Sequence, residues 1–323
     1  MNNLISVSVL GVSKAGKTSC LVSMLDHFKK DFFENIDLHF TIDALSQRIL
    51  MEQRGKLISS LDKGAIESTN GIRSTREVTK YNLKLGQKGS DSESLMVEFI
   101  DYPGSWLNNG NSADFANVKQ FAANSQVLII PIDSAYLMEM NDDTQPDIIL
   151  EILKDVYADL SQPRLVIFTP IKCEKYYGTN DSNRNKAYHA LLLKIQEKYE
   201  NVLSFLTDKS RKKNISIVII PMQTLGSCKL MYFSEPEYGV KDPVFVVTQR
   251  GVYSPKNTDQ PFLYLLSFIL KNQYESKNTG FPGFVRQLLK NHKYLNVTSE
   301  QLLQLCSNTN GIKVLQNSHI TTF

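Results

Sequence analysis

Apolar residues along the chain fall into short continuous runs that alternate with longer stretches of helical spacing. Short runs rich in β-branched residues predict buried strands, and apolar positions three and four residues apart predict helices. The first pair is a strand at Ile5–Leu10 followed by a helix at Lys17–Lys30. Repeated pairs of this kind, with strands that are apolar throughout, indicate a mostly parallel sheet buried on both faces.

The same alternation continues along most of the chain. The segments EVTKYNLKL and SLMVEFID flank the polar turn GQKGSDSE, which predicts a β-hairpin and therefore one antiparallel edge strand. Further strands are predicted at QVLIIPID, RLVIFTPI and ISIVIIP, and further helices at DIILEILKDVYADL, over residues 185–206 and at QPFLYLLSFILKNQ. The segment PEYGVKDPVFVV is interpreted as a loop that returns to a short strand.

Two parts of the chain stand apart from this alternation. Residues 31–68 contain LHFTID and then the helical pattern SQRILMEQRGKLISSL, which predicts a helical insertion. Residues 277–323 contain FPGFVRQLLKNH and VTSEQLLQLCSN, which predict two short helices. We therefore expect one α/β domain over residues 1–276 and a C-terminal helical tail over 277–323.

The segment GVSKAGKTS lies between the first strand and the first helix and matches the P-loop pattern. Gly11 and Gly16 let successive backbone N–H groups face one concavity at the start of a helix, where a phosphate binds. Lys17 is expected to reach the β- and γ-phosphates, and the Thr18 hydroxyl to ligate Mg²⁺. The expected phosphate-binding residues are Gly11, Ser13, Lys14, Ala15, Gly16, Lys17, Thr18 and Ser19.

This strand–loop–helix setting predicts the fold of a P-loop NTPase. That fold is an α/β three-layer sandwich with a mostly parallel central sheet, here with one antiparallel edge strand and a small C-terminal helical appendage. In such a sheet, ligands bind at the carboxyl ends of the strands. The loops that follow the strands are therefore where chemistry is expected.

The segment DYPG follows the second strand of the predicted hairpin. Asp101 at a strand end can hold the Mg²⁺ shell, and the Gly104 N–H can approach a γ-phosphate. Taken alone, Pro103 and Gly104 would form an ordinary turn. With a P-loop upstream, we interpret the segment as part of the same nucleotide site.

Composition and charge allow this interpretation and exclude others. The chain has 323 residues, of which 42% are hydrophobic and 21% charged, as in globular proteins. The net charge is +3, and residues 271–323 hold six Lys or Arg against two Glu. This imbalance is too weak to predict nucleic-acid binding. It is typical of a solvated basic face, with an acidic partner or a membrane surface as the alternative.

The cysteines and the apolar runs indicate where in the cell the protein is expected. The four cysteines are Cys20, Cys173, Cys228 and Cys306, and their wide spacing predicts neither a disulfide framework nor a zinc site. No charged-then-apolar leader precedes the first strand, and the apolar runs are too short to span a bilayer. We therefore expect a cytoplasmic protein without stable membrane insertion.

GVSKAGKT and DYPG resemble the first and third motifs of the translation-factor-like (TRAFAC) class of P-loop GTPases, over residues 4–272. IDYPGSWL and PKNTDQPFLYLLSFIL look more like the bacterial double-GTPase families than like Ras. The resemblance implies a GTPase that binds GTP or GDP with Mg²⁺. It also implies a protein partner, which could be an activator, an effector or a second GTPase.

The base-recognition loop departs from the GTPase pattern. GTPases carry Asn-Lys-x-Asp after the corresponding strand, whereas this chain has IKCE, residues 171–174. The Lys172 stem can pack on the base, and the Glu174 carboxylate can accept guanine's two donors while rejecting adenine. Ile171 cannot replace the Asn amide, so guanine affinity is open, and a surface Lys–Glu pair is the alternative. MQTLGS, after the next strand, lies where a backbone N–H would meet guanine O6.

The segment STNGIRSTRE offers two candidates for the switch threonine. Thr69, in a T-x-G-I context, is the residue that we expect to ligate Mg²⁺ in the triphosphate state, and Thr75 is the alternative. Either would let the loop order around a γ-phosphate and release after hydrolysis. Lys17, Thr69 and Gly104 are then the residues expected to act on the γ-phosphate.

Catalysis is expected to be slow. Ras-like enzymes place a water-orienting Gln directly after the DxxG glycine, whereas this chain has Ser105 and then Trp106. Arg73 or Arg76 could supply a catalytic arginine in cis, although exposed loop arginines are usually only solvated.

We therefore expect a GTP-binding switch with slow hydrolysis. One alternative is a P-loop ATPase or small-molecule kinase, which the missing Asn favours. The other is a nucleotide-binding structural or interaction module without turnover, which the missing Gln favours.

Overall fold

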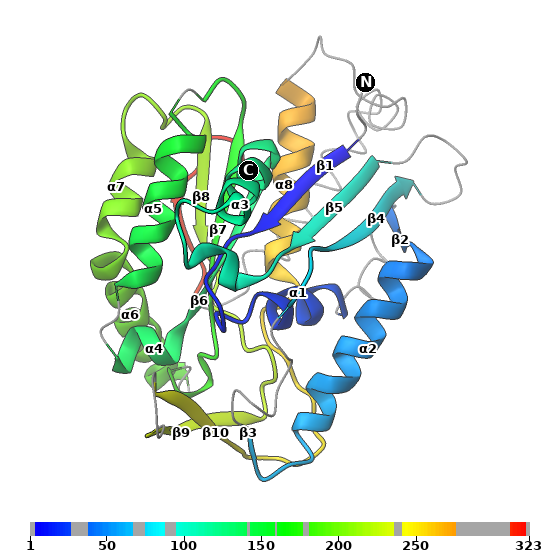
Figure 1. Cartoon of the computed structure of the whole chain (residues 1–323), viewed down its shortest axis with the longest axis vertical. Coiled ribbons are helices and arrows are strands. Elements are labelled where there is room, and N and C mark those ends of the chain that lie inside the picture. Colours follow the sequence, from blue (N-terminus) through cyan, green and yellow to red (C-terminus); the bar gives the residue numbers. More distant parts are fainter. Residues whose placement is uncertain are drawn as a thin grey trace.

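The computed structural model describes residues 4–26, 38–66, 75–87, 95–140, 143–158, 160–176, 181–235, 241–275 and 311–320. Within them, an eight-stranded sheet has the strand order β11-β8-β7-β6-β1-β5-β4-β2 (Figure 1). The five central strands are parallel: β1 (Leu4–Val9), β5 (Leu95–Asp101), β6 (Val127–Asp133), β7 (Arg164–Ile171) and β8 (Ile215–Ile219). The mostly parallel sheet predicted from the sequence is confirmed.

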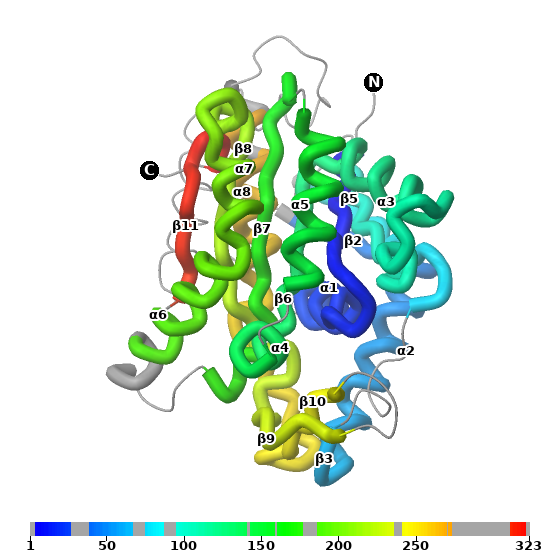
Figure 2. Tube along the Cα trace, turned by 60° about the vertical axis from the view of Figure 1, so that its left-hand side comes forward, coloured from blue at the N-terminus to red at the C-terminus, as the bar shows by residue number. Residues whose placement is uncertain are grey.

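Antiparallel strands lie at both edges of this sheet. β4 (Thr79–Gln87) pairs with β5 as the predicted hairpin, and β2 (Leu38–Ile42) pairs with β4. On the other side, β11 (Lys313–Gln316) pairs antiparallel with β8 (Figure 2). The sequence predicts one antiparallel strand at the edge of the sheet, and the structure has three antiparallel strands because the insertion and the C-terminal segment each add one.

Helices cover both faces of the sheet in the expected three layers (Figure 1). The buried apolar side chains form two clusters, and successive residues of a strand alternate between them. Val127 and Ile129 belong to one cluster, and Leu128 and Ile130 belong to the other. The first cluster includes side chains of α1 (Lys17–Asp26), α2 (Ala44–Ser60) and α8 (Gln260–Glu275). The second includes those of α3 (Ala113–Asn124), α5 (Thr144–Val156), α6 (Asp181–Lys198) and α7 (Glu200–Thr207).

Several predicted boundaries change. The helix predicted at Lys17–Lys30 ends at Asp26 in the described part of the chain, and residues 27–37 lie outside it. The single helix predicted over 185–206 is instead two, α6 and α7, which meet at Tyr199. Helix α3 and the short α4 (Ser134–Glu139) have no counterpart in the prediction.

A second, three-stranded sheet lies beyond the loop that joins β1 to α1, at the bottom of Figures 1 and 2. Its order is β3-β10-β9, with β3 (Ala65–Ile66), β9 (Cys228–Ser234) and β10 (Asp242–Val247) all antiparallel. β10 is the short strand predicted after the PEYGVK loop. β3 comes from the insertion, so segments far apart in sequence build this sheet.

The C-terminal segment is tied to the main sheet. The Gln316 side-chain amide donates to the Ile215 carbonyl at 2.7 Å, and Lys271 of α8 donates to the Ile320 carbonyl at 3.0 Å. The two helices predicted in the tail lie outside the described residues. Among the helices that the structure does describe, none combines the length and the apolar character needed to cross a membrane.

Candidate functional site

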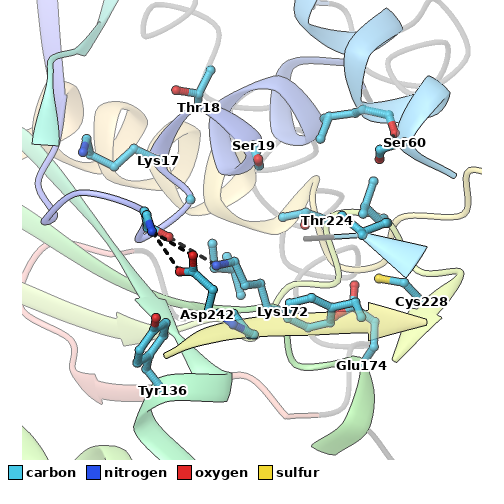
Figure 3. A pocket seen from close by; sticks show the side chains of 18 of the residues that line it. Lys17, Thr18, Ser19, Ser60, Tyr136, Lys172, Glu174, Thr224, Cys228 and Asp242 are labelled. Carbon is cyan, nitrogen blue, oxygen red and sulfur yellow. Dashed lines mark hydrogen bonds and ion pairs between the residues drawn. The ribbon is translucent and has the colours of Figure 1, made fainter. Parts of the chain in front are cut away.

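One pocket brings together the P-loop, the DYPG turn and the IKCE loop at the carboxyl ends of the parallel strands. Lys17 and Thr18 lie at one end of it, and Glu174 and Cys228 lie at the other (Figure 3). Three motifs that are far apart in sequence therefore share one cavity. Such a pocket suits a ligand that has a charged group at one end and, at the other end, a second group that the protein can recognise.

The P-loop has the backbone conformation of a phosphate-binding loop. Lys14 and Gly16 have positive φ angles of 63° and 80°. A Cβ on Gly16 would also lie 2.3 Å from Ile171 Cδ1, so glycine is required there both for conformation and for space. Ile171, which stands where GTPases carry Asn, thus packs its side chain directly against the P-loop.

Lys17 is folded back onto the loop that it belongs to. Its ammonium donates to the carbonyls of Gly11 at 2.9 Å and Val12 at 3.2 Å, and it lies 5.4 Å from the centre of the Tyr102 ring. Burial lowers the pKa of Lys17 to about 8, against the opposing influence of Asp101. A buried ammonium group whose hydrogen bonds go to uncharged carbonyl groups is a favourable partner for an incoming phosphate.

A cluster of hard oxygen ligands lies beside Lys17. The Thr18 hydroxyl donates to Asp101 Oδ2 at 2.6 Å. Thr75 Oγ1 lies 3.0 Å from Thr18 Oγ1 and donates to Asp101 Oδ2 at 3.3 Å. Asp101 Oδ1 is buried with no hydrogen-bond partner among the described residues. Hydroxyl and carboxylate oxygens suit Mg²⁺, so the donor set fits this ion.

Burial raises the pKa of Asp101, while Lys17 and the two threonine hydroxyls oppose that rise. A bound cation would stabilise the charged carboxylate, as Lys17 does, and would therefore lower the pKa of Asp101. Thr69 lies outside the described residues, so its role stays a prediction. Thr75, the alternative, is the threonine that the structure places at this cluster.

Gly104 of the DYPG turn approaches the P-loop closely. A Cβ on Gly104 would lie 2.4 Å from the Ser13 backbone nitrogen and 2.7 Å from Lys17 Nζ, so no other residue would be accommodated. Ser105 is exposed, and the half-buried Trp106 stacks on Tyr102 with ring centres 6.5 Å apart. The Tyr102 hydroxyl in turn accepts the Gly11 N–H at 3.3 Å.

Of the two arginines considered as catalytic groups, Arg76 is exposed and Arg73 lies outside the described residues. For Arg76, no contact among the described residues assigns it to the site.

The recognition end of the pocket is built around Glu174, in the short 3-10 helix Glu174–Tyr176. Glu174 Oε1 accepts the Gly226 N–H at 3.3 Å, in the loop MQTLGS. Glu174 Oε2 is buried and has no hydrogen-bond partner among the described residues. Burial raises the pKa of Glu174, which the backbone donors and Lys172 oppose. One oxygen is thus held by the protein and the other can accept from a ligand.

Lys172 connects the recognition loop to the P-loop. It has a positive φ of 54°, donates to the Lys14 carbonyl at 3.2 Å and forms an ion pair with Asp133 at the end of β6. Its stem therefore crosses the middle of the pocket, between Lys17 and Glu174 (Figure 3).

Several residues of the pocket could not be predicted from a motif. Asp242 of β10 forms an ion pair with Lys14, with Nζ–O distances of 2.8 and 3.1 Å. Thr224 and an apolar group on the far side also line it: Leu57, Ile66, Leu225, Pro243 and Phe245. Thr224 and Leu225 belong to the MQTLGS loop, which the sequence does indicate, whereas the others belong to the insertion and to the β9–β10 hairpin, which carry no recognisable motif.

A family model described as Double-GTPase 2 matches residues 5–215. The chain belongs to the Double-GTPase 2 family. The Double-GTPase 2 match includes the P-loop, DYPG and IKCE segments and ends at the first residue of β8. No curated protein matches the chain.

Solved structures similar to this Double-GTPase 2 protein are distant. The mammalian SRP receptor is 10% identical with a TM-score of 0.36, covering 68% of this chain and 90% of that one. The SRb-GTP/SRX complex from Chaetomium thermophilum is 14% identical with a TM-score of 0.36, covering 69% and 92%. The S. cerevisiae Ski7 GTPase-like domain, bound to GTP, is 16% identical with a TM-score of 0.39, covering 68% and 43%.

Proposed function

We propose that this Double-GTPase 2 protein binds GTP and GDP with Mg²⁺ and hydrolyses GTP slowly, as a nucleotide-dependent switch. The observation that carries the proposal is a pair of buried carboxylate oxygens, one on Glu174, which lines the pocket, and one on Asp101, which accepts from the pocket residues Thr18 and Thr75. Asp101 Oδ1 and Glu174 Oε2 both have no hydrogen-bond partner among the described residues. Buried acceptors of this kind are rare because leaving them unpaired costs free energy, so a ligand that reaches both is supported.

At the phosphate end, the P-loop N–H groups and Lys17 would hold the β- and γ-phosphates. Thr18, Asp101 and Thr75 would hold Mg²⁺, which neutralises phosphate charge when bound. Thr75 is the switch threonine in this proposal, because its hydroxyl lies 3.0 Å from that of Thr18. Thr69 remains the alternative.

At the base end, Glu174 Oε2 would accept the N1 and N2 donors of guanine. Adenine presents an acceptor at the position of the first donor and would leave the buried carboxylate unpaired. The Gly226 N–H fixes the other oxygen, so the carboxylate cannot easily turn to suit a different base. The Lys172 stem would cover one face of the guanine ring.

Slow hydrolysis follows from the residues after Gly104. Ser105 is exposed and too short to hold a water in line with the γ-phosphate, and the Trp106 ring stacks on Tyr102. We therefore expect unassisted turnover on the order of 10⁻⁴ per second or below, as in Ras without its activator. A protein partner that supplies the missing group is part of the proposal.

The proposal is tested by titrating the protein with GTP, GDP and ATP in the presence of Mg²⁺, by calorimetry. Glu174→Ala should weaken GTP and GDP binding by about tenfold to a hundredfold, because guanine's two donors lose their partner, and should leave weak ATP binding little changed. Equal affinity of the wild type for GTP and ATP would overturn the guanine assignment and support the ATPase or kinase alternative.

Glu139→Ala is the matched control. This carboxylate accepts from Lys175 at 2.7 Å and from Tyr176 at 2.8 Å, beside the same loop but outside the pocket lining. Its loss should leave all nucleotide affinities unchanged. A weakening in both variants would show that the loop, and not the Glu174 carboxylate, determines binding.

A further inference from the structure

The far side of the pocket is apolar, and none of it comes from the nucleotide-binding motifs. Leu57 of α2, Ile66 of β3 and Phe245 of β10 line it and are only 4%, 8% and 7% exposed. We call these three residues the apolar wall. β10 lies outside the segment that matches the Double-GTPase 2 model, which ends at residue 215. Leu57 and Ile66 lie inside that segment, so the wall is completed by Phe245, a residue from outside the matched part of the chain.

Two residues of the wall are direct neighbours across a strand pair. Phe245 lies opposite Ile66 in the antiparallel register of β10 and β3. Side chains at opposite positions of an antiparallel pair project from the same face of the sheet. The small sheet thus presents one continuous apolar surface to the pocket, with Leu57 of α2 beside it.

The small sheet is held against the P-loop at the same place. Asp242, three residues before Phe245 on β10, forms the ion pair with Lys14 at 2.8 Å (Figure 3). The Tyr136 hydroxyl donates to the carbonyl of the adjacent Lys241. The phosphate loop and the wall are therefore connected through a single strand. The position of the wall relative to the phosphate end is set by these contacts.

The apolar character of the wall suits contact with the base of a nucleotide and does not suit contact with its phosphates. A purine has polar edges and two apolar faces that stack on flat or aliphatic side chains. Glu174 would take one edge and the Lys172 stem one face, so a second face needs a partner. Phosphates require charge and N–H donors, which the wall lacks.

We propose that the apolar wall is the stacking surface for the guanine base, with Phe245 as its main contact. The proposal rests on the proposed function, since it assumes that a nucleotide enters this pocket. Under this proposal, the small sheet is part of the ligand site. β10 contacts the base through Phe245, and its Asp242 forms an ion pair with Lys14 of the P-loop.

The test compares two probes, Mg²⁺–GDP and inorganic tripolyphosphate with Mg²⁺, by calorimetry. Phe245→Ala should weaken GDP binding by about tenfold, because stacking on an aromatic ring is lost, and should leave tripolyphosphate binding unchanged. Tyr232→Ala is the matched control. It removes an aromatic ring that is 54% exposed on β9 of the same sheet, and should change neither affinity.

The outcomes separate the two proposals. If the wild type binds neither GDP nor GTP, the proposed function fails. If the wild type binds GDP and a folded Phe245→Ala variant binds it equally well, the wall is not the stacking surface, although the proposed function stands. If Phe245→Ala does not fold, Phe245→Leu keeps an apolar side chain without the ring. Weaker GDP binding with unchanged tripolyphosphate binding is then expected, and unchanged GDP binding overturns the inference.

Discussion

Lys17 is a cation that the free protein accommodates at a cost. It is 6% exposed, and its hydrogen bonds go to the carbonyls of Gly11 and Val12. Burial therefore disfavours its charged form and lowers its pKa to about 8. A phosphate would reverse this, because an adjacent anion favours the charged lysine. Nucleotide binding should thus be coupled to the protonation of this one residue.

This coupling predicts a pH dependence with a definite sign. Below about pH 8 Lys17 is already charged in the free protein, so GDP affinity should be independent of its titration. Above about pH 8 the free lysine loses its proton while the bound one keeps it, so affinity should fall by up to about tenfold per pH unit.

Calorimetry between about pH 7 and pH 9, in two buffers of different ionisation enthalpy, measures both the affinity and the proton uptake. Proton uptake should begin near pH 8 and disappear in Lys17→Met, if that variant retains measurable binding. A GDP affinity that is flat across this range, with no uptake, would contradict the assignment of Lys17 to the phosphates.

The switch threonine can be decided by a matched pair of variants. Thr75→Ala removes a hydroxyl that lies 3.0 Å from Thr18 Oγ1 and 3.3 Å from Asp101 Oδ2. The preference for a non-hydrolysable GTP analogue over GDP, measured with Mg²⁺ and with chelator, should therefore fall by about tenfold. Thr69→Ala should leave this preference intact. The opposite pattern would return the role to Thr69.

At the scale of elements, the Gly104–Leu107 turn is connected to the P-loop by aromatic packing. Trp106 stacks on Tyr102, and the Tyr102 hydroxyl accepts the Gly11 N–H at 3.3 Å. Gly104 itself lies against the backbone of Ser13. A movement of this turn toward a γ-phosphate must therefore change the surroundings of the Trp106 ring.

The protein's single tryptophan should consequently report the bound nucleotide. Emission should differ between the GDP complex and the complex with a non-hydrolysable GTP analogue. Tyr102→Phe keeps the stacked ring but removes the acceptor for the Gly11 N–H, and should reduce the difference. Identical spectra for the two wild-type complexes would remove the support for a switch in this turn.

Elements differ in how well the sequence predicts them. The parallel strands could be predicted because burial on both faces makes them apolar throughout, as in Val127–Asp133. β9 could not, because its exposed positions include Met231 and Tyr232, so the sequence does not alternate between apolar and polar residues as a half-buried strand would. The additional edge strands β2 and β11 could not be predicted as sheet members, because their partners lie in other segments and pairing leaves no local pattern.

At the scale of the whole molecule, the same limit applies to the candidate site. The P-loop and DYPG could be predicted because each motif holds its chemistry within a few consecutive residues. Lys14 and Asp242 could not be paired in advance, since they are 228 positions apart in the chain. The apolar wall likewise depends on α2, β3 and β10 meeting in space, which only the folded arrangement reveals.

The position of β11 has a consequence for the synthesis of the chain. In the described sheet, β11 is the neighbour that covers the outer side of β8, yet it comes from residues 313–316. On the ribosome, β8 therefore emerges with the N–H and C=O groups of that side unpaired, while β9, β10 and α8 are still to be made. An open strand edge is a template for pairing with other chains. The nascent protein should thus stay prone to aggregate from the time that β8 emerges until residues 313–316 have been made and can pair with it.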